Sequence, residues 1–480
     1  MKVGFISLGC SKNLVDTEMG MAVLKKHNFE IVNDPKEADM IIVNTCGFIA
    51  SAKEEAINTI LEMAEYKKAN CKYLVAMGCL VKRYKDNLEK AIPEVDLWLS
   101  IDEYKNFWEK IAELVKDSSN ESDYMSYRNR VIATGDKMAY LKIAEGCDNF
   151  CTYCAIPYIR GRYESRKFED IIEEAKGLAG NGYEEIIVIA QDTTKYGMDL
   201  YNEYRLPELL KELCKIEKIK WIRFLYAYPE SITDELLDVV KSEEKICNYF
   251  DIPIQHFSDS ILKKMNRKTS GKNICDIVNK IRKEIPDVII RTSLIVGFPG
   301  ETEEDFAVLE EAVKDLRFDR LGCFTYSKED GTPAAKFENQ VHPKTKEKRR
   351  NIIMNIQNEI SKEKMNEKIG KEYKVLIERI SDDGLFYEGR SYMDSPDTDG
   401  IIYINNIQDD LVGKFVKCKI KRAMSNNMAY NERFDINSYY YMYNERTRKT
   451  KRISTRWRRI YQRIVGDFNE LQNRRSNKKK

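Results

Sequence analysis

The chain has 480 residues, of which 42% are hydrophobic, and its formal net charge at neutral pH is +2. This length exceeds that of one ordinary domain and predicts two or three domains that bury real cores. No apolar run approaches the roughly 18 residues of a membrane span, and the N-terminus lacks the long apolar region of a signal peptide, so we expect a soluble, cytoplasmic protein.

Residues 1–124 alternate short apolar strands with helical stretches, which predicts a small parallel α/β sheet. The three clearest strands are expected at 3–9, 41–45 and 73–78. Each precedes a helix, and these helices are expected to begin near Asn13, near Ser51 and after Leu80. The polar stretch 116–130 is expected to link this domain to the next.

Residues 134–365 form a second series of strands separated by amphipathic helical stretches. Six strands are expected, at 139–146, 184–191, 221–228, 249–255, 287–297 and 320–327. Six strand–helix units imply either an open doubly wound sheet or an incomplete barrel. The pattern alone does not choose between these two folds.

The last quarter of the chain changes in hydrophobic period and then in charge. Residues 368–423 alternate with a period of two and predict a small, OB-like all-β barrel. The tail, residues 424–480, has 15 Lys and Arg against 5 Asp and Glu, a net charge of +10, which leaves −8 for the preceding residues. Such a tail would bind ribosomal RNA through phosphate contacts. The favoured interpretation is instead a disordered extension or an unselected product of a shifted reading frame, which would make the tail dispensable.

The strongest chemical signal is the motif Cys147-x3-Cys151-x2-Cys154, which directly follows a predicted strand. Three thiolates at this spacing hold three irons of a 4Fe–4S cluster and leave the fourth iron open to S-adenosylmethionine (SAM). A zinc knuckle is the alternative, but structural zinc takes four ligands and no fourth ligand follows. The motif therefore predicts a radical SAM enzyme.

A second set of cysteines follows the predicted strands of the first domain. Cys10, Cys46 and Cys79 each come at the carboxyl end of a strand. Such ends lie on one edge of a parallel sheet, where α/β folds place their ligands. Cys71 precedes its strand and would lie about 25 Å from the Cys79 edge at roughly 3.3 Å per residue. From the sequence alone, a second cluster and three buried structural cysteines are equally good interpretations.

Other positions are weaker candidates. Gly297, Pro299 and Gly300 follow the fifth strand and would suit a backbone that approaches SAM closely, because glycine has no side chain to obstruct it; an ordinary strand-to-helix turn is the alternative. Gln191 and Asp192 would meet the polar end of SAM, unless Asp192 caps a helix. The other cysteines are expected to be structural, and His256 to be a packing or substrate-side residue. The remaining cysteines are Cys71, Cys214, Cys247, Cys275, Cys323 and Cys418.

The sequence around the cysteines resembles the methylthiotransferases of the radical SAM superfamily. The resemblance covers residues 1 to about 423, and its phrases are SLGCSKNLVDTE (7–18), NTCGF (44–48), MGCL (77–80) and EGCDNFCTYCAIPYIRGRYESR (145–166). It implies a cluster-binding α/β domain, a radical SAM partial barrel and a TRAM β-barrel. It also implies that Cys10, Cys46 and Cys79 hold an auxiliary 4Fe–4S cluster, and that Cys147, Cys151 and Cys154 hold the SAM cluster.

Within the family, the sequence is most similar to the branch that modifies an aspartate of small-subunit ribosomal protein S-twelve. The phrases that carry this likeness are SKNLVDTE (11–18), AQDTTKYGMDLY (190–201), YAYPESITDEL (226–236) and the pair His256-Phe257. The branch that modifies a tRNA adenosine is the alternative, and a non-catalytic iron–sulfur RNA-binding protein is an alternative of another class. The acidic turn 393–400 would suit a basic partner, or it is a solvated loop.

The resemblance implies a reaction that uses SAM twice. One SAM methylates a cluster-bound sulfur, and the other yields a 5′-deoxyadenosyl radical that removes hydrogen from the aspartate β-carbon. The implied partners are ribosomal protein S-twelve, free or in the assembled subunit, an electron donor and a sulfur source. The sequence identifies neither the donor nor the sulfur source.

Overall fold

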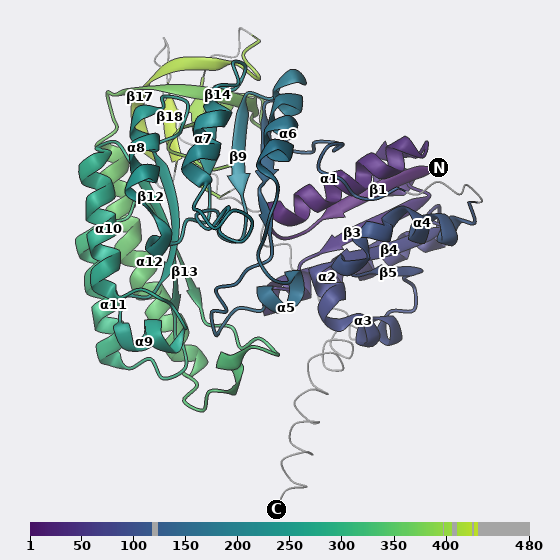
Figure 1. Cartoon of the computed structure of the whole chain (residues 1–480), viewed down its shortest axis with the longest axis horizontal. Helices are drawn as coiled ribbons and strands as arrows, with labels where there is room; N and C mark the ends of the chain where they lie inside the picture. The colour runs from purple at the N-terminus through teal and green to yellow at the C-terminus, as the bar shows by residue number, and fades with distance from the viewer. Residues whose placement is uncertain (118–122, 397, 406–409, 425–426, 431–480) are drawn as a thin grey trace, which may run out of the picture. The chain divides into compact units, whose positions relative to one another are not determined.

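The computed structural model describes residues 1–117, 123–396, 398–405, 410–424 and 427–430 (Figure 1). Within them the chain forms two compact units, residues 1–131 and residues 132–430. Among the helices of this described part, none is both long and apolar enough to cross a membrane. No disulfide bond joins any of the twelve cysteines.

The first unit is built on a five-stranded parallel sheet with the order β2-β1-β3-β4-β5. Its strands are β1 (Lys2–Ser7), β2 (Glu30–Val32), β3 (Met40–Thr45), β4 (Tyr73–Gly78) and β5 (Leu97–Leu99). Its helices are α1 (Ser11–Lys26), α2 (Ala50–Ala64), α3 (Cys79–Ala91) and α4 (Phe107–Val115). The predicted parallel α/β sheet is confirmed, and the helices that were expected to follow β1, β3 and β4 begin within two residues of the expected positions.

Helices cover both faces of this sheet. On β3, Ile41 and Val43 pack into the core with α2 and α3, while Met40 and Ile42 pack into the core with α1 and α4. Successive strand residues point to opposite faces, and both faces are covered, so all four residues from Met40 to Val43 are apolar. The expected linker ends against this unit, because Arg130 forms a buried ion pair of 2.9 Å with Glu18 of α1.

The second unit begins with six parallel strands whose order in space follows their order in the chain. They are β6 (Met138–Lys142), β9 (Glu185–Ile189), β10 (Trp221–Phe224), β11 (Tyr249–Gln255), β12 (Ile289–Val296) and β13 (Arg320–Thr325). The strands β6, β9 and β10 form one sheet and β11, β12 and β13 another, and a single bridge, Ile222 to Ile246, joins them. A doubly wound sheet would reverse its strand order at a switch point. Among the described residues β6 and β13 do not pair, so the fold is the partial barrel.

Helices on the outside of this partial barrel bury its apolar surface (Figure 1). They are α6 (Phe168–Gly180), α7 (Leu206–Cys214), α8 (Asp234–Ser242), α10 (Gly271–Glu284), α11 (Glu303–Leu316) and α12 (Pro343–Asn366). Each helix returns the chain so that the next strand runs parallel to the last, which places all the strand-to-helix loops at one end of the barrel.

A closed β-barrel with the order β14-β15-β16-β18-β17 completes the second unit. Its strands are β14 (Glu372–Ile380), β15 (Tyr387–Ser391), β16 (Ile402–Ile404), β17 (Phe415–Met424) and β18 (Asn427–Tyr430). The expected boundary at residue 423 was too early, since β18 pairs with both β16 and β17 and closes the barrel. A truncation at Met424 would therefore remove a barrel strand, and residues 431–480 of the predicted tail lie outside the described residues.

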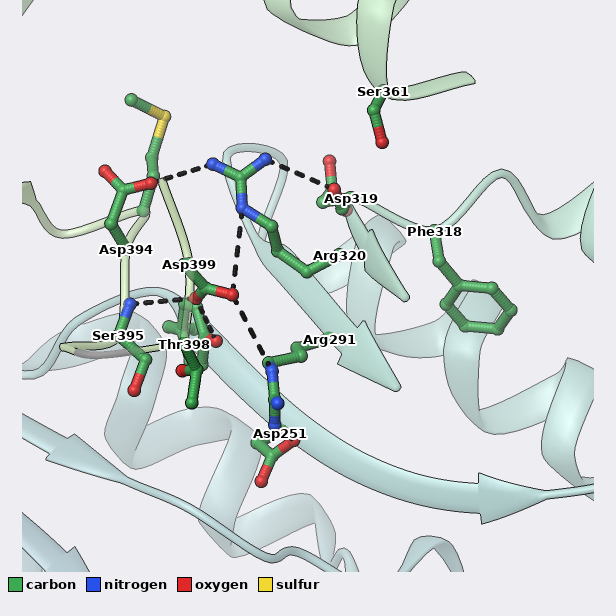
Figure 2. A network of polar contacts seen from close by, with 12 residues as sticks. Asp251, Arg291, Phe318, Asp319, Arg320, Ser361, Asp394, Ser395, Thr398 and Asp399 are labelled. Atoms are coloured by element: carbon green, nitrogen blue, oxygen red, sulfur yellow. Dashed lines mark hydrogen bonds and ion pairs between the residues drawn. The ribbon is translucent and has the colours of Figure 1, made fainter. Parts of the chain in front are cut away.

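Buried ion pairs attach the turn between β15 and β16 to the partial barrel (Figure 2). Asp394 accepts a hydrogen bond of 2.8 Å from Arg320, at the start of β13, and its side chain is 1% exposed. The Asp399 carboxylate lies 3.6 Å from Arg291 of β12 and accepts a hydrogen bond of 2.5 Å from Tyr249. The expectation of a solvated or partner-binding acidic turn is wrong for these two carboxylates, because arginines of the barrel neutralise them inside the protein.

Candidate iron–sulfur sites

Cys10, Cys46 and Cys79 lie at the carboxyl ends of the adjacent strands β1, β3 and β4. The loops that carry them pack without spare room. A Cβ added to Gly9, which has a φ of +88°, would lie 2.7 Å from the Cβ of Cys46. A Cβ added to Gly47 would lie 2.9 Å from the carbonyl carbon of Cys79. The structure therefore brings the three cysteine loops together at one edge of the sheet.

Asn13 of α1 connects the same three loops. Its side-chain amide donates to the carbonyl of Leu8 at 3.0 Å and to the carbonyl of Thr45 at 3.1 Å. Its Oδ1 accepts a hydrogen bond of 3.5 Å from the Cys79 thiol. Sequence reasoning treated Asn13 as a marker of the family branch and missed this role. The signal that could have revealed this role is a polar residue, Asn13, at a position of α1 that is buried against the sheet.

Cys71 lies at the other end of β4. It is 4% exposed, its thiol donates to the carbonyl of Tyr73 at 3.2 Å, and burial raises its pKa. This position agrees with the expectation that Cys71 belongs to the core of the first unit.

Cys147, Cys151 and Cys154 share one loop of the second unit, between β7 (Ala144–Glu145) and α5 (Ile156–Arg160). Cys147 and Cys151 are each 5% exposed, and Cys154 is half-buried. The Cys154 amide donates to the Cys151 carbonyl at 2.9 Å. Burial, reinforced by the neighbouring Cys151, raises the pKa of Cys147 to about 11 and the pKa of Cys154 still further. Thiols in such surroundings stay neutral unless a cation, such as an iron ion, compensates the charge of the thiolate.

The cysteine loop is fixed by the segment that follows α9 (Asp259–Lys264). The amide of Thr152 donates to the Met265 carbonyl at 3.0 Å and its hydroxyl donates to the Lys264 carbonyl at 2.8 Å. The Asn266 side chain donates to the carbonyl of Phe150 at 3.1 Å. These bonds anchor the cysteine loop to the end of α9 and to the two residues that follow it.

Asp192, three residues after the end of β9, also contacts this loop. Its carboxylate accepts a hydrogen bond of 2.9 Å from Asn149 and one of 2.7 Å from the Thr194 hydroxyl, and burial raises its pKa. The interpretation of Asp192 as a helix cap is wrong, since the next helix of the unit is α7, which begins at Leu206. The neighbouring Gln191 is half-buried.

The Gly297–Gly300 turn follows β12. Gly297 and Gly300 have φ values of +71° and +78°, which favour glycine. A Cβ on Gly297 would collide with the side chain of Lys346 of α12, so the close neighbour at that glycine is a protein side chain. The buried Glu301 carboxylate accepts the Phe298 amide at 3.1 Å and a hydrogen bond of 2.8 Å from Arg349, which fixes the turn around Pro299.

His256 is a packing residue. It is fully buried, its Nδ1 accepts the Ser258 amide at 3.0 Å, and burial lowers its pKa to about 4. The imidazole is therefore neutral at physiological pH and supports the turn between β11 and α9.

Among the described residues, no three His, Cys, Asp or Glu side chains are grouped closely enough to bind a single metal ion. This geometry gives no support to the zinc-knuckle alternative. In a 4Fe–4S cluster each thiolate binds a different iron, so the cysteine sulfurs do not converge on one metal ion. Two sets of three cysteines, each gathered in its own unit, suit that requirement.

The chain matches three family descriptions along its length. Uncharacterized protein family UPF0004 matches residues 2–100, the Radical SAM superfamily residues 141–313 and the TRAM domain residues 369–429. A protein of Alkaliphilus oremlandii named ribosomal protein uS12 methylthiotransferase RimO is 61% identical over 424 residues, which are 88% of this chain and 97% of that protein. A protein of the same name from Acetivibrio thermocellus is 51% identical over 432 residues, 87% of this chain and 95% of that protein.

A solved structure shows the fold at much lower identity. The radical S-adenosylmethionine methyltransferase TsrM from Kitasatospora setae has a TM-score of 0.51 and 13% identity, over 69% of this chain and 76% of that chain.

Proposed function

Because the chain belongs to the RimO family of ribosomal protein uS12 methylthiotransferases, within the radical SAM superfamily, we propose that it replaces one β-hydrogen of an aspartate in uS12 by a methylthio group. The uS12 protein is the S-twelve protein of the small ribosomal subunit. The observation that carries the proposal is the gathering of three cysteines at the carboxyl end of the strands in each unit.

The two cysteine sets are proposed to have different tasks. Cys147, Cys151 and Cys154 hold the 4Fe–4S cluster that leaves one iron open for SAM. Cys10, Cys46 and Cys79 hold the auxiliary 4Fe–4S cluster. When bound, these groups supply one-electron reduction of SAM and a sulfur that accepts a methyl group from a second SAM.

The protein's own residues position these groups and exclude water. Asn13 ties together the three loops of the auxiliary site. Asn149 and Asp192 tie the SAM-cluster loop to the end of β9. Burial of Cys147 and Cys151 shields the reduced cluster from solvent. No protein general base is assigned, because hydrogen abstraction from carbon by a radical needs none.

SAM is proposed to lie against the loops at the carboxyl end of the partial barrel. Gln191 and Asp192 from the β9 loop, and Gly297, Pro299 and Gly300 from the β12 loop, come from this end. We place the reaction in the cytoplasm, where the ribosomal protein is available free or assembled. The chain also needs an electron donor and a source of sulfur.

The substrate is tested by mass spectrometry of ribosomal proteins from cells with and without the gene. In cells with the gene, uS12 should gain the mass of one CH2S unit on a single aspartate, and tRNA adenosines should be unchanged. Methylthio-adenosine in tRNA together with unmodified uS12 would instead assign the chain to tRNA. Failure of the purified, reconstituted protein to cleave SAM would favour a non-catalytic iron–sulfur protein.

The auxiliary site is tested by changing Cys10, Cys46 and Cys79 together to Ala. This variant should still form 5′-deoxyadenosine, because the radical arises at the other cluster, but methylthio transfer to uS12 should stop. Bound iron should fall by about four per chain, the content of one cluster. The matched control is Cys71→Ala, which removes a cysteine from the same sheet at its other end. Loss of a cluster from the control would refute the assignment.

A further inference from the structure

Arg267 places a buried positive charge beside the cysteine loop of the second unit. The residue is 6% exposed, and its Nη1 lies 3.9 Å from the Sγ of Cys151. Its guanidinium carbon lies 4.3 Å from the ring centroid of Tyr228, a favourable cation–π distance. Arginine remains protonated when buried, so this charge persists at any physiological pH.

The backbone fixes Arg267 relative to Cys151. The Arg267 amide donates to the Leu262 carbonyl at 2.9 Å, at the end of α9. The preceding residue, Asn266, has a φ of +58°, which asparagine tolerates well. As described above, Asn266, Met265 and Lys264 also bond to the cysteine loop. The guanidinium and the thiol are thus held together by the segments that carry them.

The charge of Arg267 is less compensated than that of other buried arginines. Arg349 donates to the Glu301 carboxylate at 2.8 Å, and Arg160 donates to both oxygens of Glu145 at 3.0 and 3.1 Å. Arg267 donates to the Pro253 carbonyl at 3.2 Å, and among the described residues its one carboxylate within 4 Å is Glu230, at 3.8 Å. The Nε of Arg267 has no hydrogen-bond partner in the described part of the chain, which is also true of the Nε of Arg349, so the two arginines differ in their distance to a carboxylate.

We propose that Arg267 donates an N–H···S hydrogen bond to the Cys151 thiolate when the SAM cluster is bound and thereby raises the reduction potential of that cluster. Reduction adds one negative charge to the cluster, and a nearby cation in a buried site stabilises that charge more than it stabilises the oxidised form. The hydrogen bond also withdraws electron density from the sulfur, and this too raises the reduction potential. The proposal rests on the assignment of Cys147, Cys151 and Cys154 to this cluster.

The test is a redox titration of the full-length, reconstituted chain, followed by electron paramagnetic resonance of the reduced cluster. Cys10, Cys46 and Cys79 are Ala in every sample, so that one cluster reports. At the potential where the reference protein is half reduced, Arg267→Gln should lower the ratio of reduced to oxidised cluster about tenfold, which is about 59 mV for a one-electron couple. Arg267→Lys should give a smaller decrease, because it keeps the charge without the planar fork.

Glu230→Gln is the matched control of opposite sign. It removes the carboxylate 3.8 Å from Arg267 and should raise the ratio of reduced to oxidised cluster. A purely structural role of Arg267 would not predict opposite shifts for the two variants. Should Arg267→Gln fail to bind iron, the Arg267→Lys and Glu230→Gln titrations decide the matter.

Each outcome separates this proposal from the one on which it rests. A reference protein without about four irons per chain would refute the cluster assignment itself. Variants that keep their iron and show an unchanged potential would overturn the role of Arg267 and leave the cluster assignment intact. Shifts of the same sign in Arg267→Gln and Glu230→Gln would also overturn it.

Discussion

Replacing Cys147, Cys151 and Cys154 together by Ala should reduce the iron content from about eight to about four per chain, the loss of one 4Fe–4S cluster. Formation of 5′-deoxyadenosine should fall to the background of a reaction without protein. The reason is that three thiolates hold the cluster whose open iron binds SAM, and the radical has no other origin in the proposed reaction. Iron analysis and chromatographic detection of 5′-deoxyadenosine measure the two effects.

Two buried cysteines of the same unit provide the control for this triple variant. Cys323 of β13 and Cys418 of β17 are 4% and 3% exposed and belong to strands, not to the cysteine loop. Changing both to Ala removes comparable buried sulfur but should keep all the iron and the SAM cleavage. Formation of 5′-deoxyadenosine by the triple variant would show that the catalytic assignment is wrong.

Much of the site's scaffold follows from the order of elements along the chain. Strands that alternate with helices typically run parallel, and parallel strands end on one edge, so cysteines at the carboxyl ends of neighbouring strands lie close together. This rule correctly placed Cys10, Cys46 and Cys79 at one edge of the sheet. It also placed Cys71, which precedes its strand, at the opposite edge. The same alternation does not distinguish a doubly wound sheet from a partial barrel, because both contain the same units and differ in which strands pair.

The features that the sequence did not reveal depend on pairing between distant residues. Asp394 and Asp399 belong to a short acidic stretch, which typically indicates a loop exposed to solvent. Arginines more than 70 residues earlier in the chain nevertheless neutralise them. The strand β18 is four residues long and adjoins a basic segment, so its composition gave no sign of the barrel. Arg267 carried no local signal either, since its importance arises from its distance to Cys151.

Removing the Asp399 carboxylate by Asp399→Ala should lower the free energy of unfolding of the second unit by about 1–3 kcal/mol. The side chain is 2% exposed and lies among Tyr249, Arg291 and Arg320 at the junction of the partial barrel and the β-barrel (Figure 2). Arg291 and Arg320 keep their nearer carboxylates, Asp251 at 2.7 Å and Asp394 at 2.8 Å. The main cost is therefore that the Tyr249 hydroxyl and the Ser395 amide lose their acceptor in a buried site. Urea unfolding followed by circular dichroism measures the change.

Asp382→Ala is the matched control, because it removes an aspartate of the same β-barrel whose side chain is 83% exposed and which pairs with Arg379 at 3.0 Å. Water and salt screen such a pair, so this variant should unfold at nearly the same urea concentration as the original chain. Asp399→Asn keeps the shape of the side chain and removes its charge. If the buried counter-charge is what matters, Asp399→Asn should be closer in stability to Asp399→Ala than to Asp382→Ala. Equal stability of Asp399→Ala and Asp382→Ala would mean that the buried network does not hold the β-barrel on the partial barrel, and the acidic turn would again be available to a basic partner.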